Sequence, residues 1–570
     1  EGEGGILALY NLVRRRKKWA LFIALAGFAG LMAEALITPA ISVLAAVEGL
    51  NKIHPGFNST ILAVIILLVL FFSQFAGSSV LGKGFGSVML VWFLVLAILG
   101  IFHIYKLPMV FLAVNPLYGL QLILDEPRVF AIVGAVFLCI TGVEALYSDL
   151  GHAGRTNIRV AWSFVKLTLL LNYFGQGAYL LKNLNGQILP NDFSVFYELF
   201  PSTLLPYAII LSTVSTIIAS QAVISGLFSL VASAISLNLL PKLFVKYPGD
   251  VKGQVLIPVV NSILGAGCIL VTIHFQNSWN LEHAYGLSVN ITLLCTSLLY
   301  ILFVDRSNMP QALKLVFLIY LAIETVFLKA NISKFFDGAY FTVMIGFAGY
   351  LVLYSWHYGY KLLRDLREFV EIKPFLPKLS ALSEDRSIPI FCDNLVYLTE
   401  SSIPELIESR IMYSVFRKRP KRALTYFFVH LHVTDRPLQE EVKVTCFERG
   451  KIYRLDFLIG FKNRPNLQSR FNNAYEDLVA KGEIEDLSSA ESLRQYGVPR
   501  STVFVALSKM PFIEKELSFW EQILVGIWSF LRSRSLPKWR SFDLDESLIF
   551  EEKVPAFAKL SAQETIKRLV

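Results

Sequence analysis

Glu34 is a carboxylate inside an apolar run, and Thr38 and Pro39 follow it one helical turn later. Residues four apart lie on one face of a helix, so the carboxylate and the hydroxyl share a face. Pro39 has no backbone N–H, which leaves a carbonyl one turn earlier without its helical partner. A carboxylate, a hydroxyl and a bare carbonyl are hard oxygen ligands, the kind that hard cations prefer.

The depth of Glu34 in the apolar run decides between two interpretations. A charge at the centre of a membrane helix costs about 2.5 to 3.5 kcal/mol on insertion scales, so such residues usually line an ion path or relay protons. We therefore predict that Glu34 and Thr38 line an ion path. In the alternative, Thr38 bonds to its own backbone, Pro39 only kinks the helix and Glu34 pairs with a neighbouring helix.

A second set of polar residues comprises Thr141, Gly142 and Glu144, again within an apolar run. Thr141 and Glu144 are three apart and share a helix face, while Gly142 lowers helix propensity between them. A break at this point would offer unwound carbonyls to a cation, as broken helices in transporters do. The alternative is a packing glycine beside an acid that pairs with another helix.

Two further residues are weaker candidates for the same path. Tyr285 precedes Gly286 in a later apolar run and could flank the path, although packing or a place in the aromatic belt also suits a tyrosine there. Asp149 lies five residues after Glu144, at the expected cytoplasmic end, where a loop or interfacial role competes with ion binding.

Composition places the chain among polytopic membrane proteins. Its 570 residues have a mean hydropathy of +0.54 and only 17% charged residues, unlike a soluble domain. The net charge of +9 comes from short basic patches between apolar runs, which is typical of cytoplasmic loops and argues against nucleic acid binding. The sequence contains no Walker loop, hydrolase elbow or cysteine pair, so we expect no enzyme activity and no cofactor.

The order of apolar and basic segments predicts three parts: a basic cytoplasmic segment (1–18), a transmembrane domain (19–360) and a cytoplasmic C-terminal domain (361–570). Every second loop is richer in Lys and Arg, which places those loops and the tail in the cytoplasm. We expect the membrane to be the plasma membrane. About ten runs are long enough to span a bilayer, and they lie near residues 19–48, 60–76, 87–104, 128–148, 160–181, 204–230, 254–275, 284–304, 313–330 and 340–358.

The tail has a different pattern from the membrane part. Residues 422–433 and 502–507 alternate apolar and polar side chains and predict strands, while residues 473–481 and 516–532 have helical spacing. We therefore expect an α/β domain of about 200 residues.

Several collinear motifs are similar to those of the KUP/HAK/KT potassium uptake permeases. They cover about half of the chain and are highly specific, whereas the tail is recognised by position more than by motif. The motifs are Gly-Glu-Gly-Gly-Ile-Leu at 2–7, Ile-Thr-Pro-Ala-Ile-Ser-Val at 37–43, Val-Glu-Gly-Leu at 47–50, Ile-Thr-Gly-Val-Glu-Ala-Leu-Tyr at 140–147, Asp-Leu-Gly-His at 149–152, Asn-Tyr-Phe-Gly-Gln-Gly-Ala at 172–178, Ala-Ser-Gln-Ala-Val-Ile-Ser-Gly at 219–226, Gly-Gln at 253–254, Ile-Pro at 257–258 and Ala-Tyr-Gly at 284–286.

The resemblance implies a polytopic α-helical membrane domain with the LeuT-like inverted repeat of the amino acid-polyamine-organocation superfamily, followed by a cytoplasmic domain. It implies potassium import coupled to protons, with Glu34 and Glu144 as the membrane carboxylates that handle potassium and protons. Thr38 and Thr141 correspond to neighbouring oxygen donors for the same potassium ion. The implied partners are potassium, protons and the lipid bilayer. A homodimer through the C-terminal domain is a separate hypothesis, which no motif carries.

Two features depart from the family pattern. In the family, two membrane helices precede the Gly-Glu-Gly-Gly-Ile motif, so the chain as written resembles about ten helices of twelve and lacks the first-helix part of the ion site. The Ala33-Glu34-Ala35 segment keeps the acid but lacks the glycine that commonly stands beside it.

Two other functions remain as alternatives. One is a permease of the same fold for an amino acid or an organic cation, which would need a larger cavity at the helix break. The other is a sensor that does not transport and acts through a ligand of its cytoplasmic tail.

Overall fold

The computed structural model describes most of the 570 residues of the chain. The chain divides into two compact units, residues 1–356 and 357–570, and each is described here by itself. The described residues are 5–14, 17–76, 84–126, 128–139, 141–142, 154–190, 193–247, 255–305, 310–365, 368–434, 438–460, 463, 466–485, 501–510, 518–535 and 544–555.

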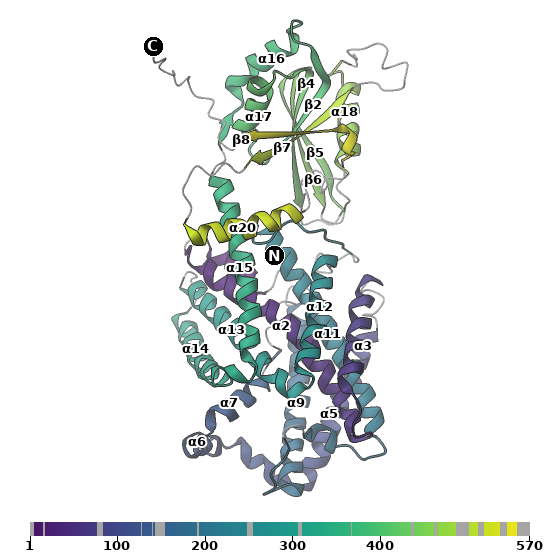
Figure 1. The fold of residues 1–570 in the computed structure, drawn as a ribbon, viewed down its shortest axis with the longest axis vertical. Helices are drawn as coiled ribbons and strands as arrows, with labels where there is room; N and C mark the ends of the chain where they lie inside the picture. The colour runs from purple at the N-terminus through teal and green to yellow at the C-terminus, as the bar shows by residue number, and fades with distance from the viewer. Residues whose placement is uncertain are drawn as a thin grey trace. The chain divides into compact units, whose positions relative to one another are not determined.

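Helices build the first unit (Figure 1). Near the middle of the unit is α2, which packs against α3, α11, α12 and α13. The helices are α1 (Gly5–Val13), α2 (Ala20–Glu48), α3 (Ser59–Ser73), α5 (Phe85–Lys106), α6 (Pro116–Asp125), α7 (Val129–Leu138), α9 (Arg155–Asn183), α10 (Val195–Glu198), α11 (Leu205–Ser236), α12 (Pro258–Phe275), α13 (Ser278–Val304), α14 (Gln311–Ile332) and α15 (Ala339–Asp365).

The membrane-spanning character of this unit is confirmed, although the number of spans stays a prediction. Seven helices in the described part are long and apolar enough to cross a bilayer. Two helices at predicted positions are shorter, α3 with 15 residues and α7 with 10. One feature was not predicted: the short helix Pro108–Val114 and α6 form an apolar pair bent by 72°.

The membrane unit holds two of its helices together by direct backbone contact. A Cβ added at Gly100 of α5 would lie 2.3 Å from the Leu171 carbonyl oxygen of α9. One added at Gly175 of α9 would lie 2.5 Å from the Gly100 Cα. Small residues allow this approach, which is a usual way for membrane helices to associate.

The second unit is an α/β domain, as predicted, with a six-stranded sheet in the order β5-β6-β4-β2-β7-β8. All neighbouring strands are parallel except the β5–β6 pair at one edge. The strands are β2 (Ile390–Leu398), β4 (Arg422–Thr434), β5 (Glu440–Glu448), β6 (Ile452–Gly460), β7 (Thr502–Met510) and β8 (Ile549–Pro555), and β1 (Phe369–Glu371) pairs separately with β3 (Leu406–Glu408).

Alternating side chains along the strands bury both faces of this sheet. Tyr397 and Phe428 face one core with α16 (Leu376–Glu384) and α17 (Ser409–Tyr413), whereas Val396 and Phe427 face a second core with α18 (Leu467–Ala480). Helices therefore cover the sheet on both sides, as buried parallel sheets require (Figure 1). The domain also contains α20 (Phe519–Arg534). The predicted strands at 422–433 and 502–507 are confirmed as β4 and β7.

Candidate ion site in the membrane unit

Glu34 lies at the midpoint of α2 and is only 3% exposed. The Thr38 hydroxyl donates a hydrogen bond of 2.8 Å to the Glu34 carbonyl oxygen. This is the backbone contact that the alternative interpretation foresaw, yet a hydroxyl that donates still has lone pairs for a cation. Coordination by Thr38 therefore stays a prediction.

Pro39 does not interrupt α2, which continues to Glu48. The thiol of Cys268, on α12, approaches the carbonyls one turn before the proline. Its Sγ lies 3.1 Å from the Leu36 oxygen and 4.0 Å from the Ala35 oxygen. Since a thiol is a weak donor, these carbonyls keep most of their capacity to bind a cation.

Close packing fixes the register between α2 and α13. A Cβ at Gly27 would lie 2.8 Å from the Cys295 Cβ, and one at Gly30 would lie 2.8 Å from the Thr292 Oγ1. The two helices therefore run antiparallel in direct contact. One turn further along α2 is Glu34, and the same register places it opposite Ser288 of α13, about one turn from Tyr285.

The end of α7 reaches the same turn of α13. A Cβ at Gly286 would lie 3.6 Å from the Leu138 Cδ2. After Leu138 the chain turns, with the Thr141 hydroxyl 2.9 Å from the Leu138 carbonyl oxygen and Gly142 at a left-handed φ of +96°. A left-handed residue cannot continue an α-helix, so α7 ends before the Thr-Gly pair.

The structure thus brings the α2 turn of Glu34 and the end of α7 to one turn of α13. Tyr285 itself is partly buried and packs against the main apolar core of the unit. Glu144 and Asp149 lie outside the described residues, so their predicted roles stay predictions. No cluster of three His, Cys, Asp or Glu side chains suited to a metal ion occurs among the residues that the structure describes.

Sequence reasoning missed Glu324, a carboxylate near the middle of α14. The Ser297 hydroxyl donates to its Oε1 at 2.9 Å, and the Asn290 amide donates to its backbone oxygen at 3.2 Å. The signal was available, because Glu324 is a lone acid in the predicted span 313–330, the same pattern that singled out Glu34.

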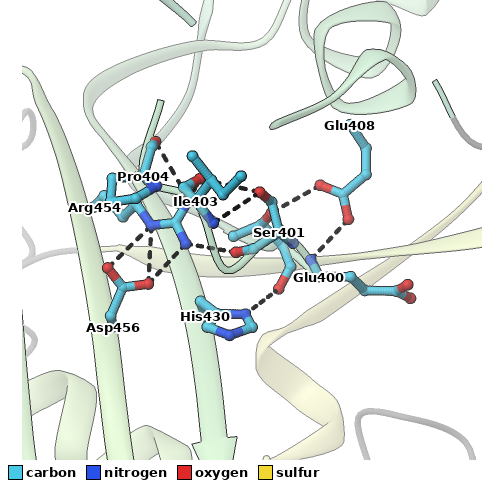
Figure 2. Close-up of polar contacts among 9 residues, drawn as sticks. Glu400, Ser401, Ile403, Pro404, Glu408, His430, Arg454 and Asp456 are labelled. Carbon is cyan, nitrogen blue, oxygen red and sulfur yellow. Dashed lines mark hydrogen bonds and ion pairs between the residues drawn. The ribbon is translucent and has the colours of Figure 1, made fainter. Parts of the chain in front are cut away.

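The C-terminal unit buries a charge in a different way. Arg454 on β6 is fully buried, and Figure 2 shows its guanidinium between Asp456 and the loop that follows β2. Nε bonds to the Asp456 carboxylate at 2.9 and 3.1 Å, and Nη1 bonds to the carbonyls of Ile403 and Pro404 at 2.9 and 3.3 Å. Nη2 bonds to the Ser401 carbonyl and to Asp456. All five N–H donors are used, so this guanidinium holds the loop and leaves no donor for a ligand.

A second buried charge in this unit is also fully engaged. The Lys421 ammonium lies 3.1 Å from Glu552 and 2.6 Å from the Ser414 carbonyl oxygen. The Ser414 hydroxyl in turn bonds to Glu552. Burial lowers the pKa of Lys421, and the hydrogen bond that its ammonium donates to Glu552 opposes that effect.

Comparison with known proteins then identifies the family. The model of the K+ potassium transporter integral membrane domain matches residues 1–361, and that of the K+ potassium transporter C-terminal domain matches residues 393–554. The chain belongs to the KUP/HAK/KT family.

Relatives in this family cover nearly the whole chain. A probable potassium transport system protein Kup from Flavobacterium psychrophilum is 41% identical over 97% of this chain and 86% of its own length. A protein of the same name from Clostridium perfringens is 36% identical over 100% of this chain and 88% of its own length. The expected family is confirmed, and with it a multi-pass membrane transporter family rather than a family of enzymes.

Proposed function

We propose that this protein imports potassium ions across the plasma membrane in symport with protons, with its C-terminal domain in the cytoplasm. Family membership supports the transport of potassium, because relatives along the whole chain carry that name. The observation that carries the site is Glu34, a buried carboxylate at the midpoint of a membrane helix that packs directly on α13.

In this mechanism, potassium loses its water and binds near the middle of the membrane. Oxygen ligands come from Thr38, from Thr141 and from carbonyls around Gly142. Glu34 or Glu144 binds and releases the proton. A nearby cation favours the ionised form of a carboxylate, while burial favours the neutral form, so the binding of potassium and of a proton are linked.

Rubidium uptake into proteoliposomes tests this function. We expect Glu34→Gln to reduce uptake at least tenfold, because the glutamine cannot exchange a proton. Glu48→Gln is the matched control on the same helix. The Glu48 carboxylate caps the start of α13 through the backbone N–H of Ser278, at 2.7 Å, and through its hydroxyl. Loss of Glu48 should therefore affect stability and leave uptake intact.

The outcomes separate the proposals. Unchanged proton-linked uptake in Glu34→Gln excludes Glu34 as the proton site, and the same result in Glu144→Gln excludes Glu144. If amino acids compete for uptake and rubidium does not, the protein is a permease for organic substrates. Absence of any uptake by the natural protein, with a tail that binds a ligand, would favour the sensor.

A further inference from the structure

The interface between α13 and α14 contains a line of polar contacts inside the membrane unit. Near one end, Lys334 follows α14 and lies 3.5 Å from Glu282 of α13. Further along, a Cβ at Gly286 would lie 2.6 Å from the Asn331 Oδ1. Glu324 lies two helical turns before Asn331, near the middle of α14, where burial of a charge is most costly.

Two oxygen atoms at this interface are buried without a donor. Glu324 Oε2 and Asn290 Oδ1 have no access to solvent and accept no hydrogen bond from any residue that the structure describes. The opposite atoms of both side chains are engaged, Glu324 Oε1 by Ser297 and Asn290 Nδ2 by the Glu324 backbone oxygen. Within the described residues, the part of the interface around Glu324 therefore contains two buried acceptors without a donor, while the unpartnered donor of the interface, Asn331 Nδ2, belongs to a residue two helical turns away.

No cation neutralises Glu324 within the described part of the chain. The two lysines of α14 are directed elsewhere, because Lys329 lies over the Phe130 ring at 4.4 Å and Lys314 bonds to Asp305 at 2.6 Å. The helices packed on α14 are α13 and α7. On α13, the titratable group beside the carboxylate is Cys295, and α7 carries no ionisable side chain between residues 129 and 138.

An ionised carboxylate in this setting would leave an unpaired charge in the membrane, and a buried group of this kind normally becomes neutral instead. A bound proton removes this charge, and it turns Glu324 Oε2 from an acceptor without a donor into an O–H donor. We propose that Glu324 is a second proton-binding carboxylate, which gains a proton from water as one O–H bond and releases it by breaking that bond. This inference rests on the proton symport proposed above.

The experiment compares rubidium uptake and internal acidification in proteoliposomes over a range of external pH. When uptake depends on one titrating carboxyl, the fraction of protein in the active protonation state changes tenfold for each pH unit beyond the pKa of that carboxyl. We expect Glu324→Gln, which keeps the shape and hydrogen bonds of the neutral acid, to transport rubidium with a flattened pH profile. Glu324→Asp should restore the slope, because it can again exchange a proton.

Two further variants make the test independent of folding effects. Glu282→Gln removes an acid from the same interface that is already paired with Lys334, and it should keep the natural pH profile. Ser297→Ala removes the donor that favours the ionised form of Glu324. It should move the midpoint of the pH profile of rubidium uptake to higher pH. If Glu324→Gln does not insert, an unmoved midpoint in Ser297→Ala overturns the proposal by itself.

The remaining outcomes are distinguishable. If the natural protein takes up rubidium without protons, the proposed symport fails. If the natural protein is coupled and Glu324→Gln has the same pH profile, only the role of Glu324 fails. A raised KM for rubidium with an unchanged pH profile would show that Glu324 contacts the metal ion, and the proton assignment would be wrong.

Discussion

Arg454 in the C-terminal sheet and Glu324 in the membrane unit are both charged residues inside the fold, but their surroundings differ. Every donor of Arg454 has a partner, and a carboxylate balances its charge (Figure 2). Glu324 has one hydrogen-bonded oxygen and one buried oxygen without a donor in the described structure. A fully satisfied buried charge holds a loop in place. A partly satisfied carboxylate inside a membrane is instead a candidate functional site.

The largest expected effect on stability is from Arg454→Met. It leaves Asp456 and three loop carbonyls without their donor, so we expect a loss of about 3 to 5 kcal/mol in the free energy of unfolding of the C-terminal domain. Denaturant unfolding of the full chain, followed by hydrogen exchange in β4 and β6, measures it.

The control for Arg454 is an ion pair at the surface. Glu440 pairs with Arg470 at 2.7 Å and its side chain is 61% exposed, so Glu440→Gln should cost less than about 1 kcal/mol. Equal losses in the two variants would show that burial does not distinguish these charges, and the contrast with Glu324 would lose its basis.

An effect of intermediate size on stability is expected at the backbone contact between α5 and α9 of the membrane unit. Gly100→Ala places a methyl group against the backbone of α9, so we expect a loss of about 1 to 3 kcal/mol, seen as a lower melting temperature in detergent. Gly346→Ala in α15 is the control, because its added Cβ meets nothing within 4 Å and alanine favours a helix by about 1 kcal/mol. A higher melting temperature in both variants would mean that α5 and α9 are not in backbone contact.

The smallest expected effect concerns the exposed pair of Lys451 and Glu384, which are 2.6 Å apart. The hydrogen bond from Lys451 lowers the pKa of Glu384, so the pair stabilises the domain above the ordinary pKa of a glutamate and loses this effect as pH falls through the lowered value. Lys451→Met should therefore destabilise the domain slightly at pH 7, and the difference from the natural protein should shrink on acidification. A difference that grows in acid would contradict this assignment.

The sequence predicted the features that depend on local patterns. Alternation in residues 422–433 indicated β4, and a carboxylate within an apolar run indicated Glu34. The same rule applied to Glu324, but only the structure shows that Ser297 and Asn290 meet it from another helix. The contact of Gly100 with Leu171 joins residues far apart in the chain, and the burial of Arg454 depends on loop carbonyls, so neither could follow from local spacing.

The edges of the six-stranded sheet have a consequence for handling the purified protein. The antiparallel edge strand β5 carries Glu440, Glu441 and Lys443 on exposed positions, and the other edge strand, β8, carries Glu551 and Lys553. Charges along an open edge oppose the addition of a strand from another molecule, which is the first step toward fibres. Concentrated samples should therefore resist aggregation through this sheet, and salt that screens these charges should weaken that resistance.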